Sequence, residues 1–202
     1  MCGLLNKLSV IADYLSKGTL KMTKVDRRVL KSQEAIKKAI LELMTEKNFD
    51  DITIRDISDR ANVNRGTIYL HYMDKFDLLD KLIEEHINNL RELCHTASEM
   101  SFQEGNYVWF EYFADNHLFF STMLNTKSSA YFRSQFLDLV VQEYKVEVDV
   151  TEGKNQGLSD GVILQFFGAA VVGIVEWWFR NGMSVPPRVM AEQTGILLDR
   201  NF

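Results

Sequence analysis

The most constraining feature of the sequence is a segment from Thr53 to Lys75 that reads as two short helices joined by a tight turn. Thr53 and Asp56 stand three residues apart, the spacing of a capping box at a helix start. The next residues, 62–64 (Asn-Val-Asn), favour a turn, because asparagine tolerates left-handed backbone and caps the helix that follows. This layout predicts a helix-turn-helix, a unit that lays its second helix in a DNA groove.

The outward side of that second helix carries groups suited to DNA. Arg65 can reach a guanine edge or a phosphate, and Gly66 allows the backbone to come close to a duplex. Ile68 and Tyr72, four residues apart, point inward. Asp74 is the expected cap of the next helix, where Lys75 and free N–H groups would meet a phosphate. The expected DNA contacts are Thr53, Arg55, Asn64, Arg65, Gly66, Thr67, Tyr69, His71, Tyr72 and Lys75. The alternative is a helical hairpin with a solvated polar surface.

The segment from about Leu30 to Leu79 resembles the DNA-binding domain of TetR-type transcriptional regulators. The matching positions are Thr53, Ile57, Ala61, Val63, Gly66, Thr67, Tyr69, His71 and Lys75, followed by Leu78 and Leu79. The departures are Ser58, Asn62, Asn64 and Tyr72, each of which keeps the size or the capping role of the usual residue. The resemblance implies that Arg65, Thr67, Tyr69, His71 and Lys75 face DNA.

The distribution of charge divides the chain into a basic N-terminal part, the head, and an acidic C-terminal part, the body. The formal net charge of −5 looks unfavourable for DNA, but residues 21–75 carry a net +3 and residues 76–202 a net −9. The basic part is therefore local to the helix-turn-helix. We expect an all-α protein with a three-helix head over residues 26–75. A ligand-binding and dimerising body would occupy residues 76–202.

Residues 1–25 form an N-terminal extension or arm. Leu4, Leu8, Ile11 and Leu15 have helical spacing, and no secretory signal is evident. Either an additional amphipathic helix packs on the head or on a partner subunit, or translation starts at Met22. In both cases a basic arm would touch phosphates or the minor groove, through Lys21, Lys24, Arg27, Arg28 and Lys31.

The body is rich in aromatic residues, with 11 of the 23 between residues 102 and 136. Such clusters form core, and in regulators of this class the body also holds an inducer pocket. His86 interrupts an apolar helix stripe, either as a polar contact for a ligand or as a core histidine satisfied by a neighbour. A small hydrophobic or aromatic effector would contact His86, Trp109, Phe113, Phe120 and Phe132.

A nearly continuous apolar run, residues 161–175, lies between Asp160 and Glu176 and is too short and too charged at its ends to span a membrane. A helix apolar on all sides predicts burial between this body and a second subunit, in a four-helix bundle with the last helix. The region resembles the C-terminal part of a Gram-positive subgroup of the same family. The expected dimer contacts are Gly168, Val171, Val172, Val175, Trp178, Met190, Gln193 and Leu197. An internal monomer core is the alternative.

These features favour a cytoplasmic homodimeric repressor that binds a palindromic operator in double-stranded DNA and responds to a ligand. An alternative is a co-regulator whose body binds a protein partner such as a metabolic enzyme subunit. No nucleophile–base pair, phosphate loop or paired carboxylates indicate an enzyme, and no cofactor is expected. Cys2 and Cys94 are far apart and indicate neither a disulfide framework nor a zinc site.

Overall fold

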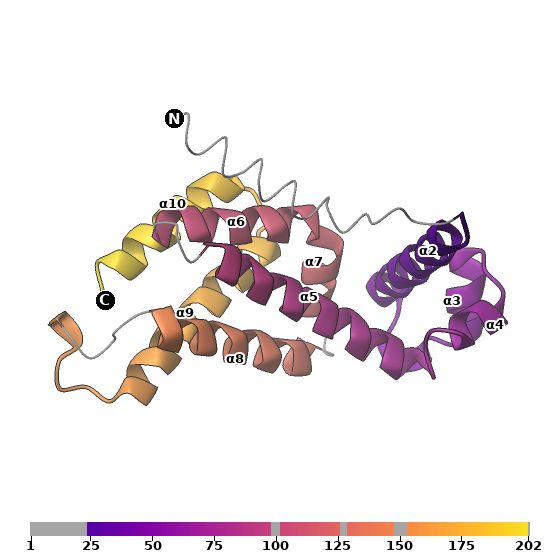
Figure 1. The fold of residues 1–202 in the computed structure, drawn as a ribbon, viewed down its shortest axis with the longest axis horizontal. Coiled ribbons are helices and arrows are strands. Elements are labelled where there is room, and N and C mark those ends of the chain that lie inside the picture. Colours follow the sequence, from indigo (N-terminus) through magenta and orange to yellow (C-terminus); the bar gives the residue numbers. More distant parts are fainter. Residues whose placement is uncertain (1–23, 98–101, 126–128, 148–152, 202) are drawn as a thin grey trace.

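The computed structural model describes residues 24–97, 102–125, 129–147 and 153–201 (Figure 1). The predicted extension lies almost entirely outside the described residues. Every regular element in the described part is a helix and none is a strand, which confirms the all-α prediction. The elements are α2 (Lys24–Glu46), a 3-10 turn η1 (Phe49–Asp51), α3 (Ile54–Ala61), α4 (Arg65–Tyr69), α5 (Lys75–Ala97), α6 (Phe102–Asp115), α7 (His117–Asn125), α8 (Ser129–Glu147), a 3-10 turn η2 (Gly153–Asn155), α9 (Asp160–Arg180) and α10 (Pro187–Asp199).

The head lies at one end of the molecule and consists of α2, α3 and α4 (Figure 1). One side of α2 is apolar and buried, with Ile36 and Ile40 fully covered. Ile57 of α3 and Ile68 of α4 meet it in the same core and are also fully covered. Burial of such side chains contributes about 1.5–3 kcal/mol each, which holds the three helices of the head in a fixed arrangement.

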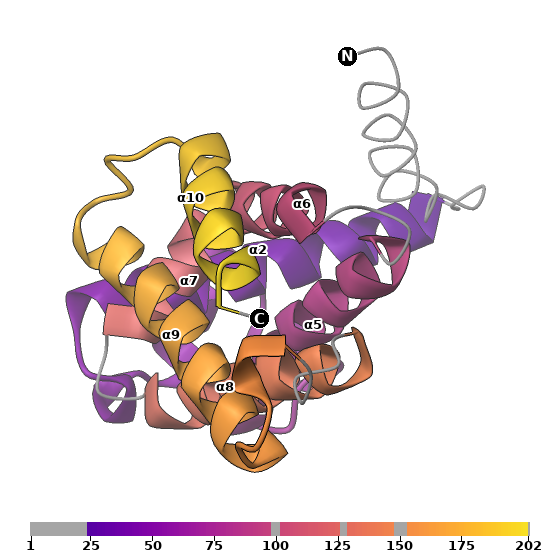
Figure 2. The same cartoon turned by 90° about the vertical axis from the view of Figure 1, so that its left-hand side faces the viewer.

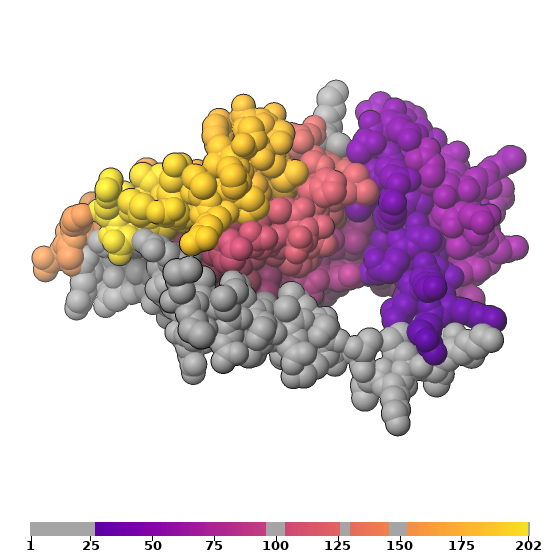
Figure 3. Space-filling model, turned by 90° about the horizontal axis from the view of Figure 1, so that it is seen from above, coloured from indigo at the N-terminus to yellow at the C-terminus, as the bar shows by residue number. Residues whose placement is uncertain are grey.

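Helix α5 leaves the head and runs into the body, so that one rod belongs to both parts (Figure 1). In the body α8 packs against α9, and α10 packs along α6. Viewed end-on, α10 lies against α6 on one side, and α8 and α9 lie on another (Figure 2). From above, the C-terminal helices and α2 lie at opposite ends, with α6 and α7 between them (Figure 3).

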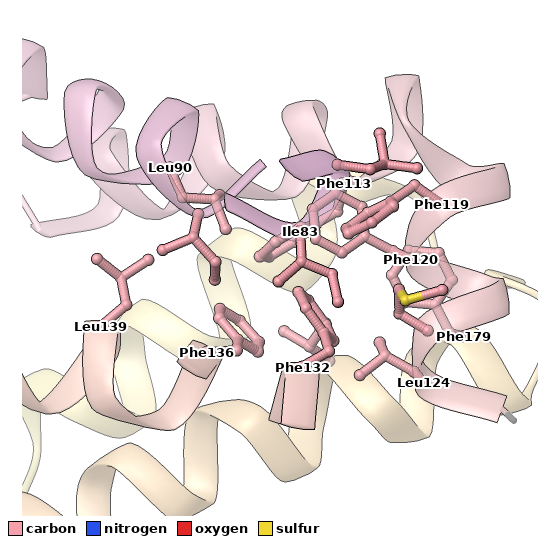
Figure 4. Close-up of a cluster of buried hydrophobic side chains, with 14 of the residues drawn as sticks. Ile83, Leu90, Phe113, Phe119, Phe120, Leu124, Phe132, Phe136, Leu139 and Phe179 are labelled. Atoms are coloured by element: carbon pink, nitrogen blue, oxygen red, sulfur yellow. The ribbon is translucent and has the colours of Figure 1, made fainter. Parts of the chain in front are cut away.

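The body is built around aromatic rings from four helices (Figure 4). Phe113 of α6, Phe120 of α7 and Phe132 of α8 are fully buried, and Phe179 of α9 is nearly so. Phe113 and Phe120 meet edge to face with centroids 4.8 Å apart. Ile83 and Leu90 of α5 reach the same cluster, which ties the head-bearing helix to the centre of the body (Figure 4).

Helix α9 has defined ends. The Ser159 side chain accepts a hydrogen bond from the Val162 N–H at the start. At the end, Gly182 has φ 65°, with its N–H bonded to the Phe179 carbonyl and the Met183 N–H bonded to the Trp178 carbonyl. This pattern is a Schellman motif, in which Gly182 terminates the helix. By length and composition α9 could cross a bilayer, but 56% of its most apolar window is buried inside the protein.

Candidate nucleic-acid interface

The helix-turn-helix is fixed by the caps that its sequence predicts. The Thr53 hydroxyl accepts from the Asp56 N–H while the Asp56 carboxylate accepts from the Thr53 N–H, which completes a capping box. Asn62 takes left-handed backbone, φ 52° and ψ 46°, and ends α3. The Asn64 side chain then accepts from the Gly66 N–H and starts α4. Three predicted turn roles are thus confirmed, and together they set the direction of α4.

Ion pairs hold α3 against α2. The Arg60 guanidinium binds both carboxylate oxygens of Glu46, at 2.9 and 2.7 Å. The Lys47 ammonium lies 2.8 Å from Asp56, and this bond, with those from Thr53, lowers the pKa of the Asp56 carboxyl well below its ordinary value. Exposed pairs contribute little individually, about 0–1 kcal/mol. Their main effect is to orient α3, since the apolar core already supplies the stability.

The outer face of α4 is open to solvent. Arg65 and Gly66 are exposed, Tyr69 is 58% exposed and Leu70 is 79% exposed. Thr67 and His71 are half-buried, and a His71 ring nitrogen lies 3.4 Å from the Gln33 amide of α2. In α3, Arg55 is exposed and lies 3.6 Å from Asp59. The face thus combines a guanidinium, a phenol and an apolar side chain on a backbone that a duplex can approach.

Tyr72 does not belong to this face. Its side chain is only 5% exposed, because it packs in the head core with Ile68, as the four-residue spacing required. The Lys81 ammonium lies over its ring at 5.6 Å. Including Tyr72 among the DNA contacts was therefore wrong, and its inward direction was right.

Lys75 also has a different role from the one expected. Its ammonium donates hydrogen bonds to the carbonyls of Phe49, Asp50 and Ile52, at 2.8, 2.8 and 2.9 Å. An ammonium has three N–H donors, so none remains for a phosphate. The rings of Phe49 and Phe76 flank it, with centroids 4.9 and 5.3 Å away. The predicted phosphate contact is wrong, because Lys75 ties the end of the α2–α3 loop to the start of α5.

The adjacent cap is as predicted. The Asp74 carboxylate accepts hydrogen bonds from the N–H groups of Phe76 and Asp77, both at 2.8 Å. Two of the N–H groups at the start of α5 are therefore used within the protein. The start of α5 therefore has fewer free N–H groups to offer a phosphate.

The five residues predicted to bind an effector lie together in the body. Phe113, Phe120 and Phe132 are fully buried and Trp109 is half-buried beside them. His86 is 8% exposed and stacks on Phe119, with centroids 3.8 Å apart. In this conformation these side chains pack directly on one another.

A polar cluster in this core was not predicted. A His86 ring nitrogen lies 2.7 Å from the Tyr112 hydroxyl, which also accepts a hydrogen bond from the Asn89 amide at 3.0 Å. Burial, and secondly the charge of Lys37, lower the pKa of His86 to about 4. Burial raises the pKa of Tyr112 to about 12. His86 is therefore a neutral core histidine with a partner, and its spacing of three residues from Asn89 was the available signal.

Most of the predicted dimer contacts face the interior of the monomer. Gly168, Val171, Val172, Val175, Trp178 and Met190 are all buried within the single chain. At Gly168 an added Cβ would lie 2.8 Å from Val141 Cγ2, so this glycine lets α9 approach α8. The Trp178 indole donates to the Val185 carbonyl at 2.7 Å. These six assignments were wrong, because the internal core uses that side of α9; of the set, Gln193 and Leu197 stay exposed.

The exposed side of α9 carries a different apolar stripe. Val162, Phe166 and Trp177 are 66%, 68% and 51% exposed. Ala169, Ala170 and Gly173 lie between them at spacings that share one helix face. The expected dimer contacts did not include Val162, Phe166 and Trp177, because both sides of the helix are apolar and periodicity could not tell the inner side from the outer. Within the described residues no group of His, Cys, Asp and Glu could hold a metal ion.

A helix-turn-helix head joined by one long helix to a helical body is the architecture of a transcriptional regulator, and comparisons with known proteins agree. Residues 36–82 match the family described as "Bacterial regulatory proteins, tetR family". Residues 100–200 match a "Transcriptional regulator C-terminal region" of the same family. The chain belongs to the TetR family of transcriptional regulators, as its helix-turn-helix residues indicated.

Two relatives are similar over part of the chain. The uncharacterized HTH-type transcriptional regulator YxbF of Bacillus subtilis is 37% identical over 89 residues, 42% of this chain and 23% of the relative. The class G tetracycline repressor protein of Vibrio anguillarum is 35% identical over 103 residues, 51% of this chain and 43% of the relative. The chain thus spans less than half of the length of either relative.

Solved structures share the fold over most of the chain. The dihydroxyacetone kinase operon activator DhaS has a TM-score of 0.57 at 22% identity, over 83% of this chain and 93% of that one. The regulator FadR of Bacillus subtilis, solved with stearoyl-CoA, has a TM-score of 0.63 at 19% identity, over 84% and 98% of the chains. At these identities the likeness concerns the fold alone.

Proposed function

We propose that this protein regulates transcription as a homodimer whose two α4 helices enter successive major grooves of a roughly palindromic operator. The observation that carries the proposal is the exposed outer face of α4, with Arg65, Gly66 and Tyr69 held in place by the caps of the turn. Arg65 would bind a guanine edge or a phosphate, and Tyr69 a phosphate oxygen. The symmetry of the operator would follow from the two-fold symmetry of the protein.

The stripe on α9 supports a dimer. Val162, Phe166 and Trp177 expose large apolar side chains along one line of the body. Contiguous exposed apolar surface is rare on monomers and marks interaction sites. The small residues between them, Ala169, Ala170 and Gly173, let a second helix approach closely. Two copies of α9, with Leu197 and Gln193 of α10 at the margin, would form the four-helix bundle.

Sedimentation equilibrium tests this interface. Phe166→Asp should convert a dimer into a folded monomer, because a carboxylate would be placed in an apolar contact without a partner. The matched control is Tyr131→Asp on α8, which changes an aromatic side chain of similar exposure (54%) outside the stripe. A Phe166→Asp protein that stays dimeric at micromolar concentration would refute the interface.

We propose that the aromatic core of the body receives a hydrophobic effector. The support is the concentration of rings from α6, α7 and α8 beside the His86–Tyr112–Asn89 cluster, which offers polar groups inside an apolar setting. Since these rings are in contact, an effector would have to separate them. Ile83 and Leu90 belong to the same core, so that separation would move α5 and the head it carries.

The output would be repression by default, since a dimer on an operator blocks polymerase access. An effector that prefers a body conformation with different head spacing would release DNA, by as much as its affinities for the two states differ. The alternative is activation of transcription through the same mode of DNA binding, since one protein of similar fold is an operon activator. Reporter expression in cells with and without the gene decides the sign.

Selection of bound fragments from the source genome, followed by gel shifts, tests DNA binding. Specific binding should weaken steeply as salt rises, because bound counterions are released from phosphates. Arg65→Ala should weaken binding and relax base preference, whereas the control Arg188→Ala, an exposed arginine of α10, should change neither. Failure of the wild type to select any sequence would refute the proposal and favour a body that binds a protein partner.

A further inference from the structure

Leu70 is the most exposed large apolar side chain in the described part of the chain, at 79%. It follows directly after α4, and its N–H remains bonded to the Gly66 carbonyl at 3.1 Å, so its backbone continues the helical turn. Its φ and ψ of −70° and −22° are helical. Leu70 therefore stands four residues after Gly66, on the same outer face as Gly66 and Tyr69. Phosphate binding does not explain a leucine at this position, because its side chain has no hydrogen-bond donor.

The major groove of DNA offers one apolar feature, the C5-methyl group of thymine. Arg65 and Tyr69, which share the outer face, carry N–H and O–H groups that can donate to phosphates or to purine acceptors, whereas the Leu70 side chain has no donor and offers apolar contact alone. When a leucine packs against that methyl group, both apolar surfaces are removed from water, which favours binding. We propose that Leu70 is a specificity-determining residue that reads a thymine methyl group in each half-site. The inference rests on the proposed function.

A protein partner is the competing explanation for so exposed a leucine. The position favours DNA, because Leu70 lies on the element whose caps and glycine open its backbone to a close approach. Helix α9, which carries the exposed apolar stripe, belongs to the body, whereas α4 lies in the head at the other end of α5 (Figure 1), so Leu70 does not extend that stripe. Of the exposed residues near Leu70 in the sequence, Arg65 and Tyr69 suit a polyanion, and Met73, 78% exposed, adds a second apolar side chain.

Substitution of thymine by deoxyuracil tests the proposal, since it removes only the methyl group. Each thymine of a selected operator half-site is replaced in turn, symmetrically in both half-sites, and the dissociation constant is measured by fluorescence anisotropy. Burying one methyl group contributes about 0.8 kcal/mol, which corresponds to about fourfold in affinity per half-site. When the sensitive thymine is replaced in both half-sites, the affinity of the wild type should fall by about 15-fold, because the two fourfold losses multiply.

Leu70→Ala should bind the thymine operator more weakly and lose most of the deoxyuracil effect at that one position. The control Leu158→Ala, an exposed leucine (57%) before α9, should keep the wild-type profile. Thermal melting followed by circular dichroism confirms that both variants fold. The inference is overturned if Leu70→Ala retains the full deoxyuracil effect, or if the wild type tolerates every replacement. In both of those cases sequence-specific binding persists, whereas loss of all specific binding by the wild type would overturn the proposed function and this inference together.

Discussion

Replacing Lys75 with methionine should destabilise the head without removing a phosphate contact. The lysine ammonium is bound by three carbonyls, those of Phe49, Asp50 and Ile52, all within 2.9 Å. Methionine keeps the apolar stem between the Phe49 and Phe76 rings but donates no hydrogen bond. The variant therefore removes the three hydrogen bonds of the ammonium and keeps the apolar packing of the side chain.

The magnitude follows from the bonds that are lost. A hydrogen bond to a charged group contributes about 1.5–3 kcal/mol, and a cation–π contact about 0.5–1 kcal/mol at an exposed site. Lys75 is half-exposed and water can replace part of its contribution at the Asp50 carbonyl. We therefore expect Lys75→Met to lower the free energy of unfolding by about 2–4 kcal/mol. That is a large fraction of the total for a domain of about 5–15 kcal/mol.

Urea unfolding and the salt dependence of operator binding are the two measurements. Lys75→Met should shift the urea midpoint downward, while the slope of log affinity against log salt stays that of the wild type. Lys38→Met is the matched control, because Lys38 of α2 is 70% exposed and only 3.6 Å from Glu42. If Lys75 neutralised a phosphate instead, the slope would fall by about 0.9 per head while stability changed little. That pair of results would refute the structural role of the three hydrogen bonds that Lys75 donates.

Two further predictions concern the body. Gly168→Ala should lower the free energy of unfolding by about 1–3 kcal/mol at fixed protein concentration, because its Cβ would lie 2.8 Å from Val141 Cγ2. Gly161→Ala, whose Cβ meets only Ser159 at 3.9 Å, should be neutral or stabilising in the same urea titration, and equal effects would contradict the close approach. His86 has a pKa of about 4 in the fold and 6.5 when unfolded, so the unfolded chain binds the extra proton and stability falls as pH drops through 6.5. From pH 7.5 to pH 5 the loss should be about 2 kcal/mol larger in the wild type than in His86→Gln, and identical losses would refute burial of a neutral imidazole.

The helix-turn-helix could be predicted from sequence because its determinants are local. Thr53 and Asp56 form a cap within one turn, and Asn62 and Asn64 set their own backbone and the next N–H groups. Each of these interactions spans at most three residues. The inward direction of Ile68 likewise followed from helical spacing and was confirmed.

What sequence reasoning could not supply depends on contacts between distant segments. The partners of Lys75 lie 23 to 26 residues earlier in the chain, so an exposed ammonium and a clasped one look alike in the sequence. The inner and outer sides of α9 differ in whether other helices of the same chain cover them, as Val141 of α8 does at Gly168. Apolar residues on both sides of a helix predict burial but do not say which side meets its own chain and which meets a partner.

Hydroxyl-radical footprinting of a selected operator shows whether two α4 helices bind one duplex at the same time. We expect two protected patches on one face of the duplex, related by two-fold symmetry and centred one helical turn or a whole multiple apart. Arg65→Ala should weaken both patches equally, and Phe166→Asp should require a much higher protein concentration to protect either. A single asymmetric patch, or protection unchanged by Arg65→Ala, would contradict a pair of α4 helices presented by a dimer.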